Sequence, residues 1–196
     1  MDFATLQTEV YQITGRSDLT AETKSAIKSA TLKCHQVDYF PKDIKEVQVN
    51  IPSPDYTVQI DLMSLDTLFR SIKYIRKYDV AEGEASDFFE ILTPEELLDS
   101  YGLERTNVAY LAGTNINIKS STKDSDMILG YYALPDITDA GFSSWVADQY
   151  PYAIIYEASR IVFTSISMPE EARNMARLFA EQIELIHRYS IVDIGN

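Results

Sequence analysis

The apolar residues of this 196-residue chain change their spacing twice. They follow three- and four-residue steps over residues 1–44, alternate with polar residues over 45–135, and return to helical steps over 142–190. Consecutive strands without helices between them argue against a doubly wound parallel sheet. The sequence therefore predicts an α+β fold, in which N- and C-terminal helices form a helical bundle and a mostly antiparallel β lobe is inserted between them.

The helical regions contain clear starts and stops. The first helix is predicted to end at Gly15, and the second to begin near Thr20. The segment Pro151–Ser165 has only Glu157 and Arg160 as charged residues, so it is predicted to be buried on nearly every face, at the centre of the bundle. A final amphipathic helix reaches residue 190, and residues 190–196 are predicted to form a C-terminal tail.

In the β lobe, two alternating runs at residues 45–51 and 56–62 flank a Pro-Ser-Pro-Asp cluster and predict an antiparallel hairpin. A capping box formed by Thr93 and Glu96 predicts a short helix over 93–101. Further strands are predicted at residues 69–78, 88–91, 107–112, 115–118 and 127–133.

The charge balance excludes some classes of function. The chain has 30 acidic and 17 basic residues, a formal charge of −13. This sign argues against a sequence-reading nucleic-acid module and against docking on an anionic membrane. No apolar run reaches the roughly 18 residues that span a bilayer, and the polar, acidic start of the chain does not resemble a signal peptide. The single cysteine, Cys34, cannot form an internal disulfide. The sequence therefore indicates either a protein of a reducing compartment or one whose fold does not depend on redox conditions.

The sequence shows no catalytic motif. Its seven glycines are scattered, which excludes a phosphate-binding loop and a dinucleotide fingerprint, and there is no Gly-x-Ser-x-Gly elbow. We interpret Cys34 as a small core residue, and His35 and His187 as ordinary surface or helix-end residues. No catalytic residue, metal site or cofactor is predicted.

Two charge clusters lie next to each other. Eight acids and no bases occur from Asp79 to Asp99, directly after a short basic strand. The acids indicate a solvated loop or, alternatively, a divalent-cation site, although no calcium-loop spacing is present. The bases could pair with the acids across a turn or a subunit boundary, or face nucleic acid.

Trp145 either fills the core between sheet and helices or is an aromatic anchor at a contact between chains. The candidate subunit-contact residues are Arg70, Lys73, Arg76, Lys77, Glu82, Glu84, Asp87 and Trp145.

The predicted tail is unusually apolar. Ile191, Val192 and Ile194 are β-branched, and each is costly to leave in water. Either they fold back on their own bundle, or they dock on another protein as an extended strand or in a groove.

The second half of the chain carries a recognisable series of segments. They are residues 93–97 (TPEEL), 110–118 (YLAGTNINI), 128–135 (ILGYYALP), 145–146 (WV) and 150–156 (YPYAIIY). Their order and spacing, over roughly residues 88–190, resemble the head-to-tail adaptor (connector) proteins of tailed bacteriophages, especially the podovirus type. The chain departs from these proteins at residues 120–126, where the turn is polar rather than proline-rich.

The resemblance implies a structural virion protein without enzymatic activity. Such adaptors form homo-oligomeric rings, usually of twelve copies, in the virion neck. One side of the ring binds the portal protein, the other binds tail or nozzle proteins, and DNA passes through the channel without sequence-specific binding. By this resemblance, Ile191, Val192 and Ile194 would reach the portal. The alternatives are another neck or tail-completion ring protein, or a carboxylate-dependent metal hydrolase built on the acidic run.

Overall fold

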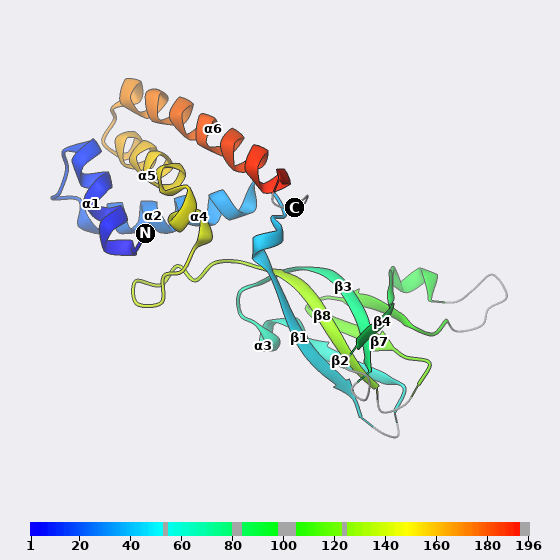
Figure 1. The fold of residues 1–196 in the computed structure, drawn as a ribbon. Helices are drawn as coiled ribbons and strands as arrows, with labels where there is room; N and C mark the ends of the chain where they lie inside the picture. The colour runs from blue at the N-terminus through cyan, green and yellow to red at the C-terminus, as the bar shows by residue number, and fades with distance from the viewer. Residues whose placement is uncertain (53–54, 80–83, 98–104, 123–124, 193–196) are drawn as a thin grey trace. The chain divides into compact units, whose positions relative to one another are not determined.

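A computed structural model describes residues 1–52, 55–79, 84–97, 105–122 and 125–192 (Figure 1). The chain divides into two units, each with its own core. The helical unit comprises Met1–Asp43 and Leu134–Asn196, and the β unit comprises Ile44–Ala133. The predicted α+β class is confirmed. Within the described residues, no helix combines the length and apolar character that crossing a membrane requires.

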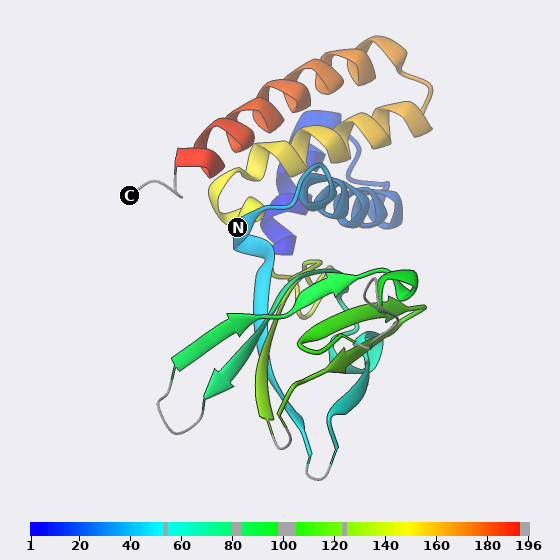
Figure 2. The ribbon, with the colours of Figure 1, turned by 90° about the vertical axis from the view of Figure 1, so that its right-hand side faces the viewer.

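The helical unit is organised around one central helix. Its helices are α1 (Phe3–Thr14), α2 (Thr20–Gln36), α4 (Trp145–Gln149), α5 (Pro151–Ser165) and α6 (Pro169–Val192), with a 3-10 turn η1 (Pro41–Asp43). Helix α5 packs against α1, α2, α4 and α6, and Figures 1 and 2 show it lying between α2 and α6. Helices from both ends of the chain therefore share one core.

Local chemistry explains where these helices begin and end. The Asp2 side chain accepts a hydrogen bond from the Thr5 N–H and so caps α1. Gly15 ends α1 with a φ of 66°, a left-handed conformation that glycine adopts without strain. The predicted end of the first helix and start of the second are both confirmed.

The core of the helical unit is apolar and closely packed. Leu6, Val10, Ile27, Ile154 and Ile155 have no exposed surface. Each fully buried side chain of this size contributes about 1.5–3 kcal/mol. The predicted burial of Pro151–Ser165 is confirmed, since α5 has the predicted bounds and supplies much of this core.

The β unit consists of two four-stranded sheets. Its strands are β1 (Ile44–Ile51), β2 (Thr57–Asp61), β3 (Phe69–Asp79), β4 (Glu84–Phe88), β5 (Glu90–Leu92), β6 (Val108–Ala112), β7 (Asn115–Lys119) and β8 (Ser125–Ala133). The sheet orders are β1-β8-β3-β4 and β2-β7-β6-β5, and every pair is antiparallel except β5–β6. Two short elements complete the unit, α3 (Leu62–Leu65) and η2 (Pro94–Glu96).

Both sheets contribute alternate residues to one core. Ile75, Met127 and Leu129 come from the first sheet, and Ile116 and Ile118 from the second, all almost fully buried. The other side of β7 carries the polar residues Asn115, Asn117 and Lys119, as expected for a strand with one buried face, whereas the other side of β8 includes Ile128 and Tyr132.

The predicted hairpin of residues 45–51 with 56–62 is wrong. Strand β1 pairs with β8, and β2 pairs with β7 in the other sheet. Alternation identifies the apolar face of each strand, but it does not identify the neighbouring strand. Both strands face the same core, from different sheets, so their patterns look like those of a hairpin.

Three other predictions differ in detail from the structure. The single strand near 88–91 is two strands, β4 and β5, in different sheets. In the region of the helix predicted over 93–101, the structure describes the 3-10 turn η2 with its Thr93–Glu96 capping box, and residues 98–104 lie outside the described residues. Helix α6 continues through Val192, because no glycine or proline interrupts it before that point, so Ser190–Val192 are helical where a tail was predicted.

Residues 134–143 return the chain from the β unit to the helical unit. Asp139 in this segment lies 2.8 Å from both Lys24 Nζ and Lys28 Nζ of α2. The hydrogen bonds from Lys24 and Lys28 lower the pKa of Asp139 to about 2. The segment is thereby fastened to the N-terminal half of α2.

Ile155→Asp is expected to abolish soluble folding. Ile155 has no exposed surface, and an unpaired buried charge costs about 3–5 kcal/mol, a large part of the stability of a domain. Tyr152→Asp is the control, because Tyr152 is exposed in the first turn of the same helix, where the helix dipole tolerates an acid. Soluble expression and circular dichroism are the measurements, and a normally folded Ile155→Asp chain would contradict this placement.

Asp139→Asn is expected to lower stability in a pH-dependent way. A carboxylate whose pKa is lower in the folded chain stabilises fully above its unfolded value of 3.8, and this contribution is lost as the pH falls through about 2. Urea unfolding of wild type and variant at pH 7, 5.5 and 2.5 should show a difference that is constant at the first two values and shrinks at the last. Asp55→Asn, which removes an exposed carboxylate from the β unit, is the matched control.

Candidate functional site

A buried polar cluster joins three parts of the helical unit. His35 Nδ1 lies 2.8 Å from Asp43 Oδ1, and His35 Nε2 lies 2.8 Å from Ser144 Oγ. Trp145 Nε1 donates to the same Asp43 oxygen at 2.7 Å. His35 is in the last turn of α2, Asp43 ends η1, and Ser144 is the N-cap of α4. These helix ends place residues more than 100 positions apart within hydrogen-bond distance.

The cluster corrects one sequence interpretation and shows the surroundings of Trp145 within one chain, while the predicted contact of Trp145 between chains stays a prediction. His35 is at a helix end, as predicted, but the expectation that it is an ordinary surface residue is wrong, because its exposure is only 2%. Trp145 packs against His35 and Phe40 in edge-on contacts, so within one chain it fills the core of the helical unit. Sequence patterns could not predict the His35 contacts, because the partners of His35 lie 8 and 109 residues away.

The order Ser144–His35–Asp43 matches the hydrogen-bond order of a nucleophilic triad. The surroundings do not suit that chemistry. The three side chains are all buried, and Ser144 Oγ already accepts the Ala147 N–H at 3.2 Å as the cap of α4. None of the three side chains lines the groove between α5 and α6 that is described below. The arrangement therefore positions backbone segments rather than presenting a reactive hydroxyl.

The segment held by this cluster is the strap, residues 37–43, which leads from α2 to β1. Phe40 in the strap is almost fully buried, with its ring 5.2 Å from that of Trp145. Asp38 lies 3.3 Å from His187 of α6. The two histidines of the chain thus contact the two aspartates of the strap, which fixes it to the helical unit.

A second buried cluster is ionic. Glu157 of α5 is 1% exposed and lies 2.7 Å from both Lys33 Nζ of α2 and the Arg160 guanidinium. Burial alone would raise the pKa of Glu157, but the hydrogen bonds from Arg160 and Lys33 outweigh it and lower the pKa. Lys33 Nζ also lies 4.7 Å from the centre of the Phe179 ring of α6. This cluster links the three longest helices.

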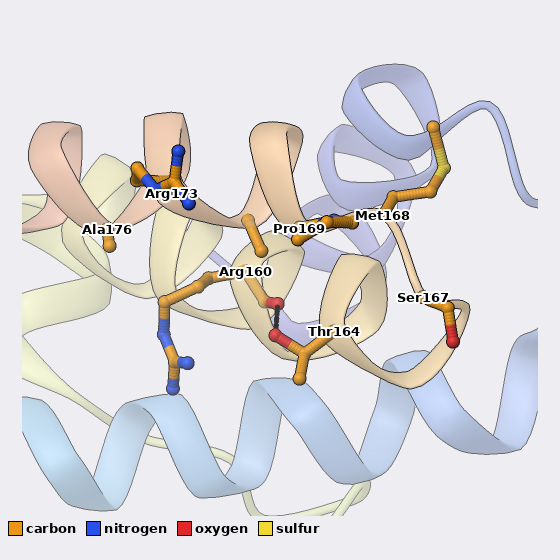
Figure 3. Close-up of a pocket in the computed structure, with 8 residues that line it drawn as sticks. Arg160, Thr164, Ser167, Met168, Pro169, Arg173 and Ala176 are labelled. Atoms are coloured by element: carbon orange, nitrogen blue, oxygen red, sulfur yellow. Dashed lines mark hydrogen bonds between the residues drawn. The ribbon is translucent and has the colours of Figure 1, made fainter.

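Above this ionic cluster lies a groove between the second half of α5 and the first half of α6 (Figure 3). It has a volume of about 490 Å³. Its lining residues are Arg160, Thr164, Ser167, Met168, Pro169, Ala172, Arg173 and Ala176. Arg160 comes from α5 and Arg173 from α6, and in Figure 3 the Arg160 side chain extends away from α6, toward α2. Arg173 pairs with Glu170 one turn away, at 3.1 Å and with both side chains about three-quarters exposed.

The predicted basic strand is β3, and its bases have contacts within the chain. Arg76 lies 3.0 Å from Glu46 of β1, and Lys73 Nζ lies 5.6 Å from the centre of the Tyr132 ring. The Tyr74 hydroxyl donates to Glu46 by crossing over Gly130 of the intervening strand, where any side chain would collide with the ring. Arg70 and Lys77 also lie on β3.

The predicted acidic contact residues and tail residues are described only in part. Glu84 and Asp87 lie on β4, which is the sequence neighbour and the pairing partner of β3. Glu82 lies outside the described residues. Glu90 pairs with Arg105, and Glu96 caps η2. Ile191 and Val192 lie in the last turn of α6, and Ile194 lies outside the described residues.

Cys34 is fully buried, and burial raises the pKa of its thiol to about 12, so the predicted core role is confirmed. Among the described residues, no group of three or more His, Cys, Asp or Glu side chains could hold a metal ion.

A scan against protein-family models gives no match, and a search of curated proteins gives none either.

Ser144→Ala is expected to destabilise the chain by about 1–3 kcal/mol, because it removes a helix cap and leaves buried hydrogen-bonding groups without a partner. Ser143→Ala, at the exposed neighbouring position, is the control. Urea unfolding measures the free energy of both variants. Unchanged stability of Ser144→Ala, or labelling of native Ser144 by a fluorophosphonate, would contradict the structural role.

Proposed function

We propose that this chain is a structural virion protein, a head-to-tail adaptor that forms a ring between the portal and the tail of a bacteriophage, with DNA passing through its channel. The proposal rests on the resemblance of residues 88–190 to podovirus-type adaptors. The observation that carries it is the role of those residues in the fold: they build turns, helix junctions and core contacts rather than a reactive site.

Individual positions illustrate this role. Gly113 makes the turn between β6 and β7 with a φ of 66°. Residues 128–133 belong to β8, the strand between β1 and β3. Trp145 holds the strap through Asp43, and Tyr150 and Pro151 join α4 to α5. The segments that resemble adaptor proteins maintain the fold, and this suits a family whose members function by assembling.

The described surface includes large side chains of the kind found at protein contacts. Those with about half or more of their surface exposed are Tyr39, Phe88, Tyr152 and Tyr189. Aromatic residues are enriched in interfaces because they combine apolar area with little loss of conformational freedom. The formal charge of −13 also favours passage of DNA through a channel without adhesion.

The purified chain, mixed with the portal protein encoded beside it, is expected to form a ring of about twelve copies on the portal, because an adaptor must match the symmetry of its partner. Native mass spectrometry and electron microscopy measure the copy number and position. A chain that stays monomeric with the portal present would contradict the proposed function.

A companion variant separates ring formation from portal binding. In our proposal Ile191, Val192 and Ile194 contact the portal, so replacing all three by Ser should leave the copies able to associate and remove portal binding. Wild-type occupancy of the portal by this variant would contradict the assigned contact while leaving the ring proposal intact.

A further inference from the structure

We propose that a pocket of the β unit, between η2 and the sheet β2-β7-β6-β5, binds a neutral saccharide. The pocket has a volume of about 560 Å³, within the range of about 300–1,000 Å³ that is typical of small-molecule sites. Its described lining comes from β2, β6 and β7 and from both ends of η2, all within the β unit. This inference goes beyond the proposed adaptor function and does not depend on it.

The register of the sheet places three hydrogen-bonding side chains of the lining side by side. Gln59 of β2 pairs with Asn117 of β7, and Asn117 pairs with Tyr110 of β6. On either side of Asn117 along β7, Ile116 and Ile118 are buried in the core, so the row lies on the other face of the sheet. Because neighbouring strands are about 4.7–4.9 Å apart, the row extends across about 10 Å.

The polar groups of this row are not used by the fold. Within the part of the chain that the structure describes, the amides of Gln59 and Asn117 and the hydroxyl of Tyr110 have no hydrogen-bond partner. Each amide provides two N–H donors and a carbonyl acceptor, and the hydroxyl can donate and accept. A ligand that carries several hydroxyl groups matches this mixed row, because each of its hydroxyls also donates and accepts.

The same pocket supplies apolar surface. The ring of Tyr110 and the side chains of Pro94 and Leu97 line it together with the amides. A sugar ring presents C–H bonds on its faces and hydroxyls around its edge, so it needs apolar walls and hydrogen-bonding groups in one site. A mixed lining of this kind therefore suits a saccharide better than a purely apolar ligand.

The charged groups of the lining favour a neutral ligand. Arg105 is bound to Glu90, and Lys119 has a partner within the chain. An anionic ligand such as a sugar phosphate would have to compete with these partners, whereas a neutral saccharide needs only the unused amides and hydroxyl.

The position of the row argues against a peptide ligand. An extended peptide is recognised chiefly through backbone hydrogen bonds at a free strand edge. Strand β7 is paired on both edges, with β2 and β6, and β6 is paired with β7 and β5. The unused groups of Asn117 and Tyr110 are side chains on the face of the sheet, where a peptide backbone would find no strand to pair with.

The test is a titration of the isotope-labelled full chain, followed by nuclear magnetic resonance. The probes are methyl glucoside, methyl galactoside, methyl mannoside, N-acetylglucosamine, maltose and lactose, with glucose phosphate and tetraglycine as the anionic and peptide comparisons. At least one neutral saccharide is expected to shift the side-chain amide signals of Gln59 and Asn117 in a saturable way. The comparison ligands are expected to bind more weakly at these signals.

Two pairs of variants locate the binding. Asn117→Ala removes the centre of the row and Tyr110→Leu removes the ring and hydroxyl at one end, so each should weaken binding by about tenfold or more. The matched controls are Asn115→Ala, on the same face of β7 and outside the pocket lining, and Tyr56→Leu, an exposed aromatic of the β unit outside the lining. Circular dichroism verifies that all four variants fold.

Binding that is lost in both test variants and kept in both controls is the expected result. The inference is overturned if no saccharide shifts the two amide signals, if Asn117→Ala and Tyr110→Leu bind as wild type does, or if a control loses binding equally. Tighter binding of glucose phosphate or of tetraglycine at these signals also overturns it, since the ligand class would then be wrong. Ring formation on the portal is measured separately, so none of these outcomes bears on the adaptor function.

Discussion

The helical unit depends on the burial of α5. A helix with apolar side chains on nearly every side is stable in water only when other elements cover it, and here α1, α2, α4 and α6 do so. This requirement explains why segments from opposite ends of the chain share one core. It also explains how the β unit can be inserted between them, because the helices on either side of the insertion are joined by packing as well as by sequence.

The charged residues of α5 are placed where they reinforce this arrangement. Glu157 is buried, and an isolated carboxylate there would be strongly destabilising, but Lys33 of α2 and Arg160 of α5 both pair with it. Because the buried Glu157 needs Lys33 as a partner, α2 must pack against α5 in the register that brings these two side chains together.

The sequence predicted features that depend on neighbouring residues and missed those that depend on distant ones. The bounds of α5 and the stop at Gly15 follow from local periodicity and backbone preference, and both are confirmed. The predicted pairing of β1 with β2 was wrong, because the alternation of apolar and polar residues does not indicate which strand lies alongside. The buried position of His35 was missed for a related reason: its partners Asp43 and Ser144 are ordinary turn and cap residues until the fold brings them together. The groove was also beyond prediction, since Arg160 and Arg173 become neighbours only through the packing of α5 on α6.

Both chain connections between the two units are fastened to the same helix. The strap is tied to the C-terminal end of α2 through His35 and Asp43, and residues 134–143 are tied to its N-terminal half through Asp139, Lys24 and Lys28. Each unit has its own core, so these two attachments belong to the helical unit and hold the ends of the inserted segment against it. Helix α2 in turn packs on α5, the element on which the helical unit depends.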